Sequence, residues 1–179
     1  VKLASGCAAH LALMATPFPA ASRNLWTRRS QGRIVAQESF GRLEALDEGL
    51  WAFVSTPLSG DYTTVCNGGI VAGREGVLVV EAFQTQEGAR WMAEKARELT
   101  GRWPTHVLVT HYHSDHTGGA RGLLPDHDSG AGVETDPDRG GVELRVTPTT
   151  LNLKKERSRP DADETGLRPW TDAVLVAED

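Results

Sequence analysis

The feature that most constrains the fold is a strand–helix–strand pattern across residues 77–110. Residues 77–80 (Val-Leu-Val-Val) form a continuous apolar run, which is typical of a central strand covered on both faces. A helix follows, with Thr85 as its predicted N-cap and Gly101 just past its end. A second strand is predicted at residues 105–110. A crossover of this length makes the two strands parallel neighbours, so we expect an α/β (α+β) fold.

Further strands are predicted upstream of this unit. Residues 43–46 and 50–54 are two β-prone runs on either side of a glycine-containing turn at residues 47–49, which indicates a hairpin. Residues 65–72 are predicted to form another strand, whose glycines permit a bulge or a close backbone approach. Small and apolar residues form one stripe along the helix, which predicts that it packs on the sheet: Ala89, Met92, Ala93, Ala96 and Leu99.

The pattern continues downstream with weaker elements. Residues 142–146 alternate between polar and apolar side chains like a strand, and residues 173–176 read as a short final strand. Between them, residues 148–159 are a candidate helix that Thr147 can cap.

The stretch at residues 110–119 carries the chemistry, because three of the chain's six histidines fall within six positions where the second strand ends. Two glycines at its end make a sharp turn easy. His111 and His113 are two residues apart, so on an extended backbone they point to the same side and can hold one zinc ion. Asp115 and His116 can reach a second ion, and two adjacent metals would support hydrolysis. The alternative is a surface loop with scattered histidines.

This stretch resembles the T-H-x-H-x-D-H signature of the metallo-β-lactamase superfamily, and the segments 67–71 and 76–80 are similar to the family's opening hairpin. The resemblance implies an αβ/βα sandwich with one or two zinc ions. It places His111 and His113 on the first ion and Asp115 and His116 on the second, with Asp115 also orienting the nucleophilic water. The family's substrates include β-lactams, thioesters, and sulfate and phosphate esters, so the fold does not define the substrate.

The chain departs from the family pattern at two places. Glu81 stands where the family has an aspartate after the strand, which moves the charge by one methylene. The family also needs two later histidines and a bridging carboxylate, whereas only His127 follows His116. Substitution by His127 with Asp126 or Asp128 is the alternative. We therefore expect residues 41–179 to be an incomplete domain, the N-terminal part of the sandwich, with low stability and little or no activity by itself.

The N-terminal region reads as a targeting segment. Residues 1–21 are small and apolar but interrupted by two prolines, which predicts a secretory signal peptide and no membrane span. The alternative is a disordered or helical extension. Residues 22–40 carry four arginines and are expected to be a linker or a mature N-terminal arm. The protein is therefore expected to be exported, to the periplasm or outside the cell.

Composition and missing motifs exclude other classes. The net charge of -5, with no stripe of Lys or Arg, argues against nucleic acid as a partner. A nucleotide-binding or redox domain lacks its Gly-rich, P-loop or C-x-x-C motif, and two cysteines do not predict a disulfide framework. We expect a zinc-dependent hydrolase acting on a small-molecule ester, amide or thioester. The alternative is a non-catalytic zinc-binding or interaction remnant completed by another chain.

Overall fold

The computed structural model describes residues 32–124, 140–157 and 173–176, all within one compact unit, Gly32–Asp179. The predicted signal peptide at residues 1–21 and the run that carries His127 lie outside the described residues. Along the described part of the chain, no helix combines the length and the apolar character needed to cross a membrane.

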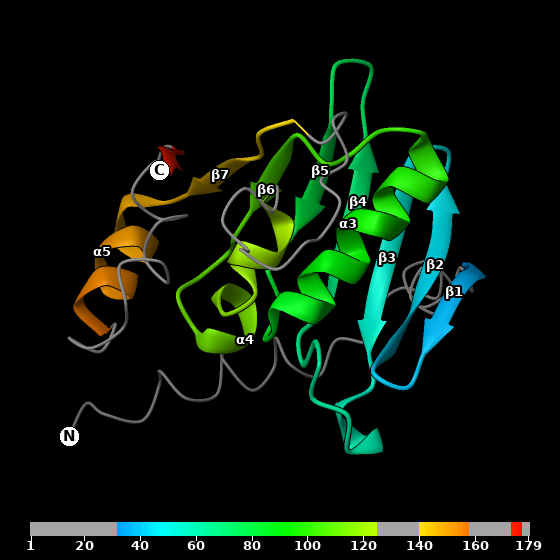
Figure 1. The fold of residues 1–179 in the computed structure, drawn as a ribbon, viewed down its shortest axis with the longest axis horizontal. Coiled ribbons are helices and arrows are strands. Elements are labelled where there is room, and N and C mark those ends of the chain that lie inside the picture. The colour runs from blue at the N-terminus through cyan, green and yellow to red at the C-terminus, as the bar shows by residue number, and fades with distance from the viewer. Residues whose placement is uncertain (1–31, 125–139, 158–172, 177–179) are drawn as a thin grey trace, which may run out of the picture. The chain divides into compact units, whose positions relative to one another are not determined.

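Eight strands form one mixed sheet in which the order in space is the order in the chain, which confirms the predicted α/β class (Figure 1). The pairs from β1 to β5 are antiparallel, and the pairs from β5 to β8 are parallel. The strands are β1 Arg33–Glu38, β2 Gly41–Asp47, β3 Leu50–Ser55, β4 Gly68–Ala72, β5 Val77–Val80, β6 His106–Leu108, β7 Glu143–Val146 and β8 Val174–Leu175. The helices are α3 Gln86–Thr100, α4 Ser114–Thr117 and α5 Pro148–Arg157, with 3-10 turns η1 Pro57–Ser59 and η2 Ala120–Leu123.

The N-terminal strands differ in how well the sequence predicted them. The hairpin of β2 and β3 is confirmed, with Gly49 at a φ of 70° in its turn. Strand β1 lies inside the range 22–40 that the sequence suggested was a linker or arm. Most of its residues are exposed or half-buried, so it has no run of buried side chains to reveal it, and pairing with β2 defines it as a strand.

Two strands are shorter than their sequence patterns. Strand β4 begins at Gly68, because Val65 has a φ of 65° and an extended ladder cannot contain that conformation. Strand β6 spans only three residues, although its predicted parallel pairing with β5 is confirmed. In β5, Val77 and Val79 are fully buried, whereas Leu78 and Val80 are half-buried. The second face of this strand is therefore less covered than the apolar run predicted.

Helix α3 packs one face of the sheet and forms the core with it (Figure 1). Its predicted caps are confirmed: Thr85 Oγ1 accepts a hydrogen bond from the Gly88 amide at 3.1 Å, and Gly101 adopts a φ of 73°. Of the predicted stripe, four residues are fully buried and Leu99 is half-buried. An aromatic cluster extends this core toward β2 and β3: Phe40, Phe53, Phe83 and Trp91.

Helix α5 follows β7 as predicted and reaches Arg157 in the described part of the chain. Thr147 caps it, because its Oγ1 accepts a hydrogen bond from the Thr150 amide at 3.2 Å. The parallel pairing of β6 with β7 brings the start of α5 to the edge of the sheet where β6 ends.

Candidate metal centre

The candidate centre lies where the neighbouring parallel strands β5 and β6 end. Glu81 follows β5 directly, and Thr110 lies two residues beyond β6. The two connections are tied together, because the Glu81 amide donates to the Leu108 carbonyl at 2.8 Å. The carboxyl ends of parallel strands meet at one edge of a sheet, which is where α/β folds place their sites.

Glu81 is the buried acid of this region, with 4% of its surface exposed. Thr110 donates to its carboxylate twice, from Oγ1 to Oε1 at 2.5 Å and from the amide to Oε2 at 3.4 Å. His116 Nδ1 lies 3.1 Å from Oε2, an ion-pair distance, but the two groups are not aligned as a hydrogen bond. Glu81 therefore contacts both ends of the histidine-rich stretch.

The loop after β5 is strained and firmly held. Glu81 and Phe83 have φ angles of 75° and 59°, a left-handed conformation that costs a side-chain-bearing residue roughly 1–3 kcal/mol. The Ala82 amide donates to the His116 carbonyl at 3.0 Å, and the Gly119 amide donates to the Phe83 carbonyl at 2.9 Å. These bonds oppose relaxation of the loop and fix its position against α4.

Three histidine rings gather in front of this loop. The ring centroids of His111 and His116 are 3.9 Å apart, and those of His111 and His113 are 4.9 Å apart. His116 Nε2 lies 3.3 Å from Asp115 Oδ2. Thr110 Oγ1 lies 3.0 Å from His111 Nδ1. The structure thus brings all four predicted ligands, His111, His113, Asp115 and His116, into one neighbourhood.

The two glycines after α4 have a role different from the one predicted. Gly118 and Gly119 have φ angles of -64° and -87°, which any residue adopts, so no special turn requires them. They are needed for close approach: a Cβ on Gly119 would lie 2.2 Å from the Thr85 carbonyl oxygen, and one on Gly118 would lie 2.4 Å from that of Gln84. Glycine allows α4 to contact the loop after β5 directly.

The donor set suits zinc in its chemistry, since imidazole nitrogens and a carboxylate are common zinc ligands. As the side chains stand, no three His, Cys, Asp or Glu residues in the described ranges surround a point that could hold an ion. The rings contact one another instead. The last torsion of histidine is a soft one, so reorienting these rings costs little. The residues therefore fit the metal by donor type and proximity.

Cys66 lies beneath the centre. Burial, followed by the nearby charges of Glu81 and Asp115, raises the pKa of its thiol to about 12. At neutral pH Cys66 is therefore a buried, free and uncharged thiol.

Helix α5 contributes two cations beside the centre that sequence reasoning did not connect to it. Lys154 Nζ donates to Thr117 Oγ1 at 3.0 Å, and the Arg157 guanidinium lies 4.7 Å from the centre of the Tyr112 ring. Burial lowers the pKa of Lys154. Lys154 and Thr117 are 37 positions apart in the sequence, so no local spacing pattern could have revealed the contact.

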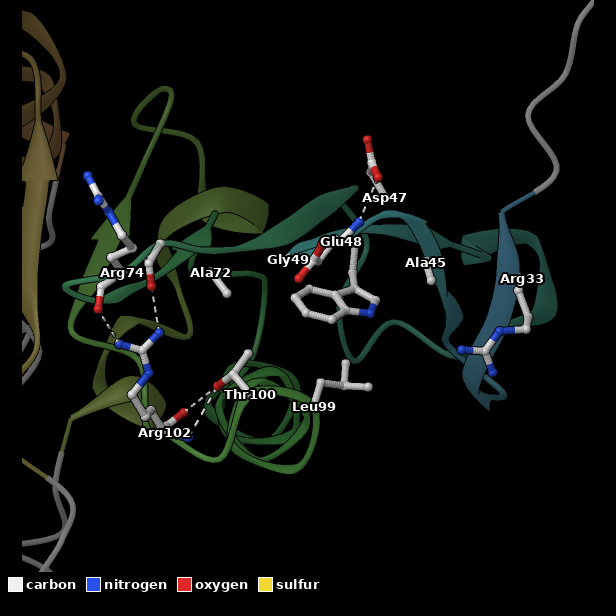
Figure 2. Close-up of a pocket in the computed structure, with 12 residues that line it drawn as sticks. Arg33, Ala45, Asp47, Glu48, Gly49, Ala72, Arg74, Leu99, Thr100 and Arg102 are labelled. Carbon is white, nitrogen blue, oxygen red and sulfur yellow. Dashed lines mark hydrogen bonds between the residues drawn. The ribbon is translucent and has the colours of Figure 1, made fainter.

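Away from the candidate centre, a hollow lies at the other end of β5 (Figure 2). It is formed by the β2–β3 turn, the β4–β5 turn and the end of α3, and its volume is about 670 Å³. The guanidinium of Arg102 donates to the carbonyls of Gly73 at 2.6 Å and Arg74 at 3.1 Å. No histidine or cysteine is among its described lining residues. It is therefore separate from the candidate centre.

In a comparison with protein families, the model of the metallo-beta-lactamase superfamily matches residues 61–173 of this chain. That range contains the whole histidine-rich stretch and its loop partners. No curated protein matches the chain at a significant level.

Solved structures similar to this chain include three metallo-β-lactamases. One from Erythrobacter litoralis, with β-mercaptoethanol in the active site, is 20% identical with a TM-score of 0.49, and the match covers 68% of this chain and 47% of that one. One from Hirschia baltica is 22% identical with a TM-score of 0.48, covering 65% and 48%. FIM-1 from Pseudomonas aeruginosa, in the mono-zinc form, is 15% identical with a TM-score of 0.48, covering 71% and 49%. The match spans about half the length of these structures.

Proposed function

Because the chain belongs to the metallo-β-lactamase superfamily, we propose that it is a zinc-dependent hydrolase whose metal ligands are His111, His113, Asp115 and His116. Superfamily membership supports a metal-dependent hydrolase in general. The proposal is specific in three respects: it names these four ligands, it names zinc as the metal, and it places one or two ions in the site.

One observation carries it: the three histidine rings and Asp115 gather where β5 and β6 end, behind which Glu81 is buried. A buried carboxylate against a histidine orients the imidazole and raises its basicity, which is the usual support of a metal-binding histidine. Glu81 has this position relative to His116, at 3.1 Å.

The residues have distinct roles in the proposed reaction. His111 and His113 hold the first ion, Asp115 and His116 hold the second, and Asp115 also orients the attacking water. Zinc, when bound, polarises the bond to be cleaved and lowers the pKa of water. Thr110 is hydrogen-bonded to Glu81 and lies 3.0 Å from His111 Nδ1, so these two residues support that ligand, and the backbone hydrogen bonds of the loop after β5 oppose its displacement.

The substrate class and the location complete the proposal. A polarised carbonyl or phosphoryl centre corresponds to a small-molecule ester, amide or thioester substrate. The net charge of -5 does not suit nucleic acid as a partner. We place the reaction outside the cytoplasm, in the periplasm or the medium, on the apolar composition of residues 1–21.

The test measures zinc content together with turnover. We expect His111→Ala to abolish zinc uptake, measured by elemental analysis after dialysis, and to abolish any hydrolysis of a β-lactam, a thioester or a phosphodiester. His106→Ala is the matched control, because His106 lies in β6 and its Nδ1 is 2.8 Å from Thr105 Oγ1. Unchanged zinc uptake in His111→Ala would overturn the ligand assignment.

A second candidate is a zinc-binding or interaction protein without catalysis. The observation that favours it is an exposed apolar pair on the sheet, since Leu50 and Val71 pair across β3 and β4 and are 37% and 39% exposed, which is typical of a surface covered by another chain. The two candidates separate in the same experiment. Zinc uptake with no turnover on any of the three substrates supports the second, and zinc-dependent turnover supports the first.

A further inference from the structure

A small pocket opens directly beside His113, between the histidine-rich stretch and α5. Its volume is about 250 Å³, and Tyr112, His113, Ser114, Lys154 and Arg157 line it. No carboxylate is among these described lining residues, whereas two of the five are the basic residues Lys154 and Arg157. The described lining thus has the composition of an anion site and includes the predicted metal ligand His113.

The two cations are held in position by contacts with the histidine-rich stretch. Lys154 is half-buried, and its Nζ donates a hydrogen bond to Thr117 Oγ1 at 3.0 Å. Thr117 directly follows His116 in the chain. An ammonium carries three donors, of which the bond to Thr117 uses one. The lysine is thereby anchored to the same short helix that carries Asp115 and His116.

Arg157 contacts the Tyr112 ring through a cation–π interaction. Its guanidinium lies 4.7 Å from the centre of the Tyr112 ring, and the Tyr112 and His113 ring centroids are 4.6 Å apart. A guanidinium carries five N–H donors whose geometry suits a planar or tetrahedral oxyanion. Tyr112 therefore connects the cation on α5 to the ligand His113.

We propose that Lys154 and Arg157 form a subsite for an anionic group of the substrate, with Tyr112 and Ser114 as its neutral walls. The subsite takes a carboxylate, sulfate or phosphate group and places the rest of the molecule against His113. It deepens the proposed function, because it assigns that hydrolase a negatively charged substrate and positions it through α5.

The test measures anion binding in the absence of zinc, so that neither metal uptake nor turnover is needed. The zinc-free full chain is titrated with sodium sulfate, sodium phosphate and sodium acetate at constant ionic strength, and amide shifts are followed by NMR. We expect saturable shifts at residues 112–114 and 154–157. Tighter binding of sulfate or phosphate indicates that the anionic group of the substrate is a sulfate or phosphate, and tighter binding of acetate indicates that it is a carboxylate.

The variants separate specific from general charge effects. The double variant Lys154→Gln/Arg157→Gln should weaken binding by about tenfold or more, because each charge-assisted hydrogen bond lost has an effect of at least this order. Lys155→Gln removes one charge from an exposed position on the same helix outside the pocket, and should change affinity by less than about twofold. If the double variant does not fold, Arg157→Gln at its exposed position replaces it.

The outcomes distinguish the subsite from the zinc site. Absence of saturable shifts in the unsubstituted chain overturns the subsite, and so does equal affinity in the double variant and in Lys155→Gln. Anion binding that persists in His111→Ala while zinc uptake is lost supports two separate sites. Anion binding without zinc uptake in the unsubstituted chain supports the subsite and contradicts the zinc hydrolase.

Discussion

At the scale of single residues, Glu81 connects the parts of the candidate centre. It accepts hydrogen bonds from Thr110, lies 3.1 Å from His116, and adopts a left-handed φ of 75°. A buried carboxylate in a strained backbone is unfavourable for stability alone, so its position is best explained by the support of the ligands.

Glu81→Gln should weaken zinc binding by about 10- to 100-fold, because the amide keeps the size of the side chain but removes the negative charge beside His116. The measurement is competition for zinc against a chromophoric chelator. Glu81→Asp is the control that keeps the charge and shortens the side chain by one methylene. Equal zinc affinity in Glu81→Gln and the unsubstituted chain would contradict a supporting role.

Asp61 gives a pH-dependent prediction in a separate region. Hydrogen bonds from Ser39 and then from Thr63 hold the pKa of its carboxyl below the ordinary value of 3.8. The folded pKa lies below the unfolded one, so the stabilisation is complete above the unfolded pKa and is lost as pH falls through the folded pKa. The difference in Tm between the unsubstituted chain and Asp61→Asn should therefore be constant near neutral pH and shrink below about pH 4. A difference that persists unchanged to pH 2 would show that the charge is not responsible.

At the scale of elements, α4 is positioned by contact with the loop after β5 and has only four residues of its own. The His116 carbonyl in α4 accepts a hydrogen bond from the Ala82 amide at 3.0 Å, and the Gly119 amide just past the helix donates to the Phe83 carbonyl at 2.9 Å. A helix this short has almost no stability in isolation. The ligands Asp115 and His116 therefore depend on a tertiary contact for their placement.

Gly119→Ala should destabilise the fold by about 1–3 kcal/mol, because the added methyl would lie 2.2 Å from the Thr85 carbonyl oxygen and 2.3 Å from that of Ala82. Displacement of α4 should lower zinc uptake as well. Gly140→Ala is the control, since a Cβ there has nothing within 4 Å, and it should change stability by less than about 0.5 kcal/mol. Urea unfolding compares the two, and equal midpoints would contradict the close approach.

At the scale of the whole molecule, the sheet has one densely packed face and one that is only partly covered. Ile70, Val79 and Val107 pair across β4, β5 and β6 in the buried row. The adjacent row pairs Leu50 with Val71 and Val71 with Leu78, and the first two are 37% and 39% exposed. The alternation of the strands places these apolar side chains on the face opposite the core.

Zinc should raise the stability of the described domain as a whole, because a ligand that binds only the folded state shifts the equilibrium toward it. At about 100 times the dissociation constant the gain is about 2.7 kcal/mol, which corresponds to roughly 5–10 °C in Tm for a domain of this size. Thermal unfolding with zinc, and with EDTA added afterwards, measures it. His111→Ala should show no increase, and an equal increase in that variant would place zinc elsewhere.

Local features were predictable from the sequence: the cap and the end of α3, the β2–β3 hairpin, and the four donors in one stretch. They depend on residues close together in the chain, where hydrogen-bond spacing and side-chain periodicity act directly. The parallel pairing of β5 with β6 was also predictable, from the length of the crossover between them. The late start of β4 was not, because a β-branched valine gives no indication of the left-handed conformation that Val65 adopts.

The residues that support those donors became apparent only from the folded chain. Glu81 meets Thr110 across 29 positions, and Lys154 meets Thr117 across 37, so their contacts depend on strand pairing and helix packing. The folded chain also showed that Gly119 permits a close approach of two backbones, since that requirement exists only once both segments are in place. The chemistry of the centre is thus encoded locally, whereas its orientation, burial and neighbouring charges arise from segments far apart in the chain.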